Sequence, residues 1–136
     1  MADLQGWKYN VEQDTMAVTL ALDATEGLLQ KVSDASTSPM TVTTCGAGGV
    51  PVGASIQDVD ISEDGTRSTV VRNGWAPLTA AAAVTDCTLP VKAAASGQVT
   101  PVTTDLDVIV GYPLHTAESG SIVLVDLKLM GSFYGV

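Results

Sequence analysis

Few residues of this chain have the types and spacing that chemistry requires. Nucleophilic catalysis needs a positioned base, usually a histidine, and His115 is the sole histidine of the 136 residues. It lies in Tyr112-Pro113-Leu114-His115-Thr116, and no Gly-x-Ser-x-Gly sequence is present. Asp105 and Asp107 flank an expected strand, which leaves a glycosidase-like carboxylate pair open, but nothing else in the sequence supports one. We therefore interpret His115 as a surface or loop-packing histidine and predict a protein that is not an enzyme.

Metal and cofactor motifs are equally weak. Cys45 and Cys87 lie far apart without Cys-x-x-Cys spacing, so we expect two reduced core thiols, although a disulfide between them is left open. The glycine-rich residues 44–51 lack the Lys-Ser/Thr of a phosphate-binding loop. The acidic residues 58–65 lack the glycine and glutamate of an EF-hand, and the alternation of acidic and apolar residues at 58–61 predicts a strand with one solvated face. We predict no metal and no cofactor.

The composition and charge of the chain exclude some classes of binding partner. The chain has the length of one domain, and it is 46% hydrophobic but only 4% aromatic, with a net charge of −9. Because nucleic acids and anionic lipids are bound mainly by Lys and Arg clusters, we predict neither as a partner. The first eight residues lack a basic region followed by an apolar stretch, and no run reaches the roughly 18 apolar residues of a membrane helix. We expect a soluble protein that is not secreted.

The elements that must position these residues are mostly strands. Large apolar residues occupy every second position of residues 16–22, which is the period of a half-buried strand. Eight further apolar runs are separated by turn sequences at residues 63–65, 72–74, 95–97 and 118–120. These runs are residues 27–32, 40–44, 50–56, 67–72, 89–92, 99–102, 108–112 and 122–129. The alanine-rich residues 78–86 are the one stretch that favours a short helix. The pattern predicts a mainly β domain.

An internal echo runs through the two halves of the chain. A strand at residues 28–32, the sequence Val50-Pro51-Val52-Gly53, an acidic turn and Val70-Val71 come in the same order as residues 88–92, 108–113, 118–121 and 123–125. The offsets are about 53 to 61 residues, in the range where internal repeats indicate repeated structural units. We predict two pseudo-repeated halves.

Three regions follow from this pattern. We expect an extended N-terminal arm at residues 1–15, a β-rich domain at 16–129 and a hydrophobic tail at 130–136. Trp7, Tyr9, Phe133 and Tyr134 lie in the two terminal segments, and aromatic side chains are common interface anchors. We predict that at least one terminal segment contacts a neighbouring subunit or a larger assembly; folding back onto its own domain is the alternative.

The residues also carry a family resemblance. The order Val-Gly-Ala-Ser-Ile-Gln-Asp (52–58), Val-Val-Arg-Asn-Gly (70–74), Leu-Pro-Val-Lys (89–92), Ser-Gly-Gln-Val-Thr-Pro-Val (96–102) and Val-Ile-Val-Gly-Tyr-Pro-Leu (108–114) resembles the capsid-decoration (cement, or head-stabilising) proteins of tailed phages. The resemblance covers about residues 24 to 129 and implies a small single-domain β-barrel or β-tulip. It also implies a homotrimer that binds the major capsid protein on the virion surface and stabilises the expanded head. Assembly would then take place in the host cytoplasm. The aromatic arm and the hydrophobic tail depart from the family pattern.

Two other functions remain open. One is another β-rich virion component, either a head-fibre base or a tail-tube subunit, although no hairpin is clearly long enough for a tube lumen. The other is a small non-catalytic binding module, such as a carbohydrate-binding domain. Such a domain usually presents several exposed aromatics, and the predicted β-rich region contains only Trp75 and Tyr112.

Overall fold

The computed structural model describes residues 13–103 and 107–129. Nine strands, β1 to β9, form one sheet, and the helices of this part of the chain are short. The elements are β1 (Gln13–Leu20), β2 (Leu29–Asp34), β3 (Thr41–Thr44), β4 (Gly53–Ser55), α2 (Ile61–Asp64), β5 (Arg67–Thr79), β6 (Val91–Ala93), η1 (Ala95–Gly97), β7 (Val99–Pro101), β8 (Gly111–Pro113) and β9 (Ile122–Lys128). The predicted mainly β, single-domain fold is confirmed.

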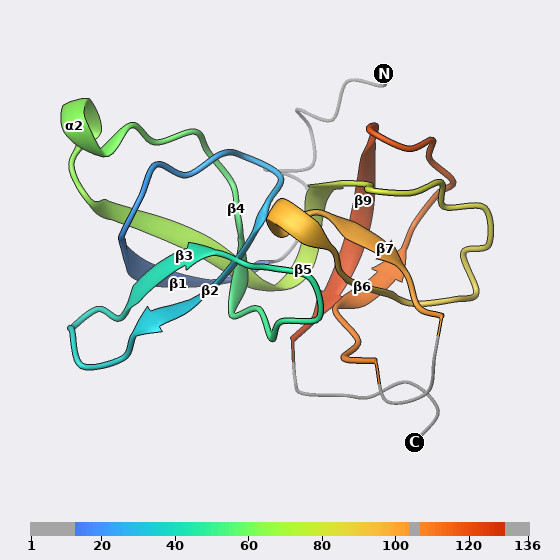
Figure 1. The fold of residues 1–136 in the computed structure, drawn as a ribbon, viewed down its shortest axis with the longest axis horizontal. Helices are drawn as coiled ribbons and strands as arrows, with labels where there is room; N and C mark the ends of the chain where they lie inside the picture. The colour runs from blue at the N-terminus through green and yellow to red at the C-terminus, as the bar shows by residue number, and fades with distance from the viewer. Residues whose placement is uncertain (1–12, 104–106, 130–136) are drawn as a thin grey trace.

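The sheet curls into two rings that share β5. The first ring closes through the pairs β1–β3, β3–β2, β2–β4, β4–β5 and β5–β1. The second ring runs from β5 through β9, β8 and β6 to β7, and a parallel bridge between Ala80 and Val99 returns it to the end of β5. In Figure 1 the two rings form two lobes, and β5 passes from one to the other.

The two rings repeat the same pairing pattern, which confirms the predicted pseudo-repeat. β1 corresponds to the second half of β5, β2 to β6, β3 to β7, β4 to β8, and the first half of β5 to β9. The parallel contact of β1 with β3 reappears as the parallel Ala80–Val99 bridge, while every other strand pair is antiparallel in both rings. Even the isolated bridge Ala24–Val59 has a counterpart, Val84–Ala117, at an offset of about 60 positions.

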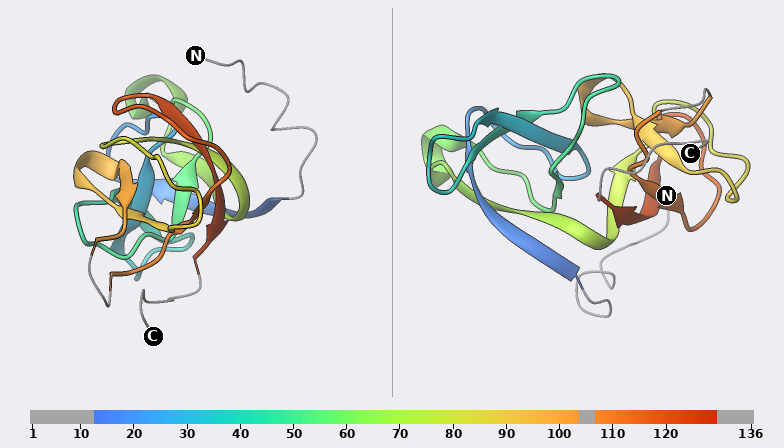
Figure 2. Two further views of the ribbon diagram at one scale, coloured as in Figure 1. Left: turned by 90° about the vertical axis from the view of Figure 1, so that its right-hand side faces the viewer. Right: turned by 90° about the horizontal axis from the view of Figure 1, so that it is seen from below.

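A β-bulge lets β5 serve both rings. Asp14 pairs with Asn73 but Thr15 pairs with Val71, so Arg72 is an extra residue that reverses which face of the strand points inward. Val70 belongs to the smaller core cluster, inside the first ring. Val71 belongs to the larger core cluster, together with Ala76 and Leu78. The second view in Figure 2 shows β5 continuing along both lobes. The predicted turn at residues 72–74 is therefore wrong, because the turn-forming residues mark a bulge within one long strand.

The larger core cluster joins the rings into one unit. It contains Leu29, Cys45 and Ala54 from the first ring, packed with residues that line the inside of the second. Backbone hydrogen bonds cross the same boundary, from Gly97 N to Cys45 O (2.7 Å) and from Gly48 N to Ala93 O (3.2 Å). The glycine-rich loop that resembled a phosphate-binding sequence thus packs against the other ring.

Two expected elements differ in the structure. The helix predicted at residues 78–86 is absent from this described stretch, because Ala80 and Val84 are buried core residues that form bridges to Val99 and Ala117. The strand predicted at Asp58–Ile61 is reduced to one bridge at Val59, after which α2 begins with Asp60 as its N-cap. Long-range pairing and local capping each override the simple sequence pattern at these positions.

Candidate interaction surface

An amphipathic sheet face covers the outside of the second ring. On β5, β9 and β8 the residues Trp75, Asp126 and Tyr112 lie side by side in the register, and Pro77 and Leu124 follow in the next row. Leu114 N donates to Leu124 O (2.9 Å), which places Leu114 in that second row. We call the surface formed by Trp75, Tyr112, Leu114, Asp126 and Lys128 the aromatic face; Pro77 and Leu124 share its register but are buried.

Large side chains on this face remain accessible to solvent. Trp75 is 40% exposed, Tyr112 44% and Leu114 41%. Exposed aromatics with polar neighbours are the composition of interaction surfaces, because they bury much area for little lost entropy. Asp126 and Lys128 add an ion pair with an Oδ2–Nζ distance of 3.7 Å, and such an exposed pair contributes little to stability.

The pseudo-repeat reveals what is unusual about the aromatic face. In the first ring the positions of Tyr112 and Asp126 are taken by Ala54 and Val71, which are both fully buried against the second ring. The second ring carries a tyrosine and an aspartate where the first carries small apolar residues. Its outer face is thus built for solvent or for another partner, and the repeat alignment is the sequence signal that would have identified it.

His115 forms backbone hydrogen bonds at one edge of this face. Its Nδ1 lies 2.9 Å from Thr116 O and its Nε2 accepts a hydrogen bond from Leu124 N (3.1 Å). Because Nε2 accepts, the proton is on Nδ1, which donates to the Thr116 carbonyl. The interpretation of His115 as a packing residue agrees with these contacts.

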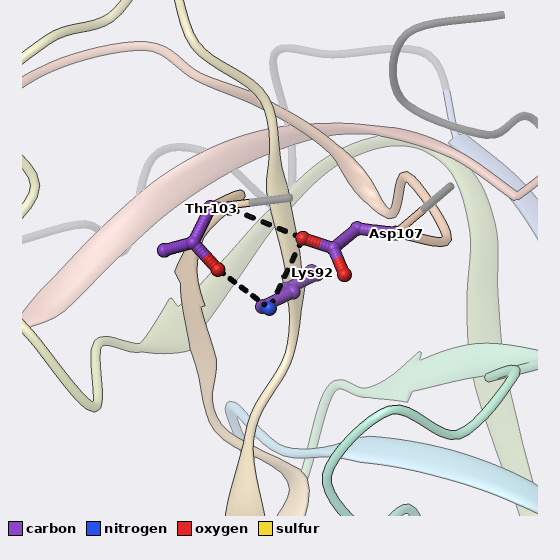
Figure 3. A network of polar contacts seen from close by, with 3 residues as sticks. All are labelled: Lys92, Thr103 and Asp107. Carbon is purple, nitrogen blue, oxygen red and sulfur yellow. Dashed lines mark hydrogen bonds and ion pairs between the residues drawn. The ribbon is translucent and has the colours of Figure 1, made fainter. Parts of the chain in front are cut away.

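Lys92, Thr103 and Asp107 form a polar network at the other end of the ring (Figure 3). Lys92 Nζ lies 3.1 Å from Asp107 Oδ2 and 3.2 Å from Thr103 Oγ1, and Thr103 N donates to the same carboxylate oxygen (3.1 Å). Both charged side chains are largely buried, with 22% and 16% of their surface exposed. The network joins β6 to both ends of the segment between Thr103 and Asp107.

Three exposed aspartates stabilise turns of one kind. Asp34, Asp60 and Asp86 each accept hydrogen bonds from the backbone and the hydroxyl of the Ser or Thr two positions later. The hydroxyl hydrogen bond is the largest cause, and the backbone hydrogen bond the second, of a pKa lowered below the ordinary aspartate value in all three. Among the described residues no group of three or more His, Cys, Asp or Glu side chains could hold a metal ion.

The thiols do not share one environment. Both cysteines are free, and Cys45 is buried as predicted. Burial raises the pKa of the Cys45 thiol, and Lys31 lowers it in part. Cys87 is exposed, so its prediction as a core thiol is wrong. Val84 is still buried, but the chain reaches the surface after it, so Asp86 and Cys87 are exposed.

The interface candidates Trp7, Tyr9, Phe133 and Tyr134 lie outside the described residues, as do the predicted tail and most of the predicted arm. β1 begins at Gln13, which pairs with Gly74, and β9 ends at Lys128, which pairs with Asn73. β1 therefore begins, and β9 ends, beside Trp75 of the aromatic face. None of the helices in the described ranges is long and apolar enough to cross a membrane.

Comparisons with known proteins give a structural match. No protein-family model matches the sequence, and no curated protein does. A solved structure, the head fiber gp8.5 N base of bacteriophage phi29, superposes with a TM-score of 0.68 at 13% sequence identity. The match covers 89% of this chain and 98% of the other. The two proteins share a fold over nearly their whole lengths.

Proposed function

We propose that this chain is a structural protein of a tailed-phage virion that binds the outside of the head through the major capsid protein. The fold shared with a phage head-fiber base is the observation that carries the proposal. The order of motifs between residues 52 and 114, which resembles that of capsid-decoration proteins, supports it independently. In its leading form the protein is a homotrimer that bridges capsid subunits and stabilises the expanded head.

The proposed role is mechanical and requires no catalysis, cofactor or nucleic acid. His115 uses both ring nitrogens in backbone hydrogen bonds, and Asp107 is held by Lys92. The net charge of −9 would keep decorated particles mutually repulsive and disfavours contact with the packaged DNA. The protein would assemble onto heads in the host cytoplasm and remain on the virion surface.

A second candidate is the base of a head fibre, which the same structural match favours. Such a base binds the head but holds another component outward, so it need not stabilise the shell. No contact among the described residues favours a tail-tube subunit or a small non-catalytic binding module over these two head-binding roles.

Binding to heads tests the proposal. Purified full-length protein is mixed with expanded heads that were assembled without it, and the heads are pelleted. We expect co-sedimentation in proportion to the shell lattice and a trimer of 13.9 kDa chains in light scattering. A monomer that stays in the supernatant would contradict both head-binding candidates.

The thermal stability of decorated heads distinguishes the two candidate functions. Decorated and bare heads are warmed, and DNA release is followed with an intercalating dye. A higher release temperature for decorated heads supports the stabilising role, whereas binding without any shift supports the fibre-base role.

A further inference from the structure

Each side of the contact between the two rings has a counterpart elsewhere in the repeat that stays exposed. We propose that these counterparts meet between molecules: the aromatic face of one copy, centred on Tyr112, docks on the end of the first ring of a second copy, centred on Val32. The proposal rests on the self-association in the proposed function and assigns it to two surfaces. It does not depend on what the protein binds on a phage head.

Within the chain, the turn between β6 and β7 packs against the outside of the first ring. Gly97 N donates to Cys45 O, and Gly48 N donates to Ala93 O. A Cβ added at Gly97 would lie 3.0 Å from Leu29 O, so the two rings approach closely here. Leu29, Cys45 and Ala93 belong to one core cluster. The contact between the rings is therefore tight and apolar.

Tyr112 is the exposed counterpart of the first ring's side of this contact. It takes the place of Ala54 in the repeat, and Ala54 has no exposed surface whereas Tyr112 is 44% exposed. The neighbouring positions of the second ring, Pro90 and Val102, are buried. A contact at this surface therefore centres on Tyr112.

Val32 is the exposed counterpart of the second ring's side. It pairs with Val42 in the first ring as Ala93 pairs with Val99 in the second. Ala93 is only 3% exposed beside the first ring, whereas Val32 is 37% exposed. The turn that follows, residues 35–40, corresponds to the turn between β6 and β7. Val32 thus presents an apolar side chain at the position that is covered in the other ring.

The contact requires two copies. β4, β5 and β9 separate β2 from β8 in the sheet. In Figure 1, β2 and β9 lie in different lobes. A ring of the same fold covers the corresponding surfaces within the chain, so a second copy offers the shape that fits them. Stacked repeats need a polar outer face at their ends unless another unit covers them, and Tyr112 and Val32 are not such a pair of polar caps.

The proposed contact is head-to-tail, because it joins two different surfaces. Contacts of this kind close into a ring of copies when the rotation between neighbours permits it. A homotrimer, as in the proposed function, is one such ring. Every copy then uses its aromatic face once and its Val32 surface once.

Light scattering of the full-length protein over a concentration series measures the contact. The net charge of −9 opposes association, so the series is run at physiological salt, where the Debye length is about 8 Å. We expect the wild type to reach a mass of several 13.9 kDa chains. Tyr112→Glu and Val32→Glu should each raise the dissociation constant at least about thirtyfold, the loss expected at the centre of an interface.

Mixing the two variants tests the head-to-tail arrangement. Tyr112→Glu retains the Val32 surface, and Val32→Glu retains the aromatic face. Each variant alone should be monomeric, and their equimolar mixture should form a species with twice the mass of the 13.9 kDa chain. Leu22→Glu is the matched control, because Leu22 is 65% exposed and its counterpart Ala82 is exposed as well; its assembly should equal that of the wild type.

Circular dichroism checks that the variants fold, and Tyr112→Ala repeats the test without an added charge. Assemblies of wild-type mass in both glutamate variants would overturn the proposed surfaces while leaving a homotrimer held by another surface. Monomeric variants that do not combine when mixed would overturn the head-to-tail arrangement. A wild type that stays monomeric throughout the series would overturn the contact itself, whereas head binding is judged separately by co-sedimentation.

Discussion

Gly111→Ala should destabilise the second ring, because β8 approaches β9 there more closely than a side chain allows. A Cβ built at Gly111 would collide with the carbonyl oxygen of Asp126 and would lie 3.0 Å from Val125 Cγ1. Gly111 is in the register with both Val91 and Leu127, so a backbone shift would disturb two strand pairs. The obstructing atom belongs to the backbone and cannot rotate away.

The expected cost follows from overpacking. Forcing an extra carbon into a packed site costs about 3 kcal/mol at the upper end of the usual range. The lower entropy of an unfolded chain with alanine returns about 0.4–1 kcal/mol. The net loss of about 2–2.6 kcal/mol should lower the melting temperature by about 6–8 °C, at roughly 3 °C per kcal/mol for a domain of this size.

Two other glycines make the measurement decisive. Gly53 is the counterpart of Gly111 in the first ring, and an added Cβ would lie 2.5 Å from Val70 Cγ2 and 2.7 Å from Val70 Cβ. Val70 Cγ2 can rotate away but Val70 Cβ is fixed by the backbone, so Gly53→Ala should also destabilise the fold, by about 1–3 kcal/mol. Gly46→Ala is the control, since an added Cβ would meet nothing within 4 Å. Thermal unfolding by circular dichroism in which Gly111→Ala melts within about 1 °C of Gly46→Ala would refute the close approach.

Three further predictions concern polar groups and thiols. Ser55→Ala leaves the Nε2 of buried Gln30 without its 2.9 Å acceptor and should cost about 1–3 kcal/mol in urea unfolding, whereas Gln30→Leu combined with Ser55→Ala should recover most of the loss. The lowered pKa of three aspartates stabilises the fold above their ordinary value of 3.8, and this contribution is lost as the pH falls through their folded-state pKa values. A variant in which Asp34, Asp60 and Asp86 are all changed to asparagine should therefore lose less stability between neutral pH and pH 3 than the wild type does. An equal loss of unfolding free energy in the two proteins over this pH range would contradict the prediction. Under native conditions Cys87 should react rapidly with a thiol reagent while Cys45 reacts only on unfolding, and the Cys87→Ser variant should show no fast phase.

The strands and their repeat could be predicted because they depend on short-range patterns. Apolar runs between turn sequences located eight of the nine strands of the described chain to within about three residues and the start of the ninth, β5, and the repeated order of motifs indicated two similar halves. Where each strand ends depends on partners far away in the sequence. Residues 72–74 have the composition of a turn, yet β5 continues through them because it pairs with β1 before the bulge and with β9 after it.

The alanine-rich residues show a second limit of local patterns. Alanine favours helices, so residues 78–86 suggest one, but propensity differences of a few tenths of a kcal/mol per residue are smaller than the cost of a misfitted core. Ala80 has no exposed surface and forms a bridge to Val99, which a helix at this place could not do. The aromatic face was not predicted for a similar reason: Trp75 and Tyr112 become neighbours only when β9 lies between β5 and β8.

The repeat also indicates where this sequence has specialised. Corresponding core residues of the two rings differ in size but offset one another. Leu20 and Ala24 of the first ring correspond to Ala80 and Val84 of the second, so the larger side chain comes first in one ring and second in the other. Such exchanges preserve a packed interior because total volume is kept.

The outer faces have changed in kind instead, from the buried Ala54 and Val71 of the first ring to the solvent-accessible Tyr112 and Asp126 of the second. Core packing does not require a tyrosine or an aspartate at these positions. The outer face of the second ring is therefore where the two halves of the chain have diverged in kind, and not only in the size of their side chains.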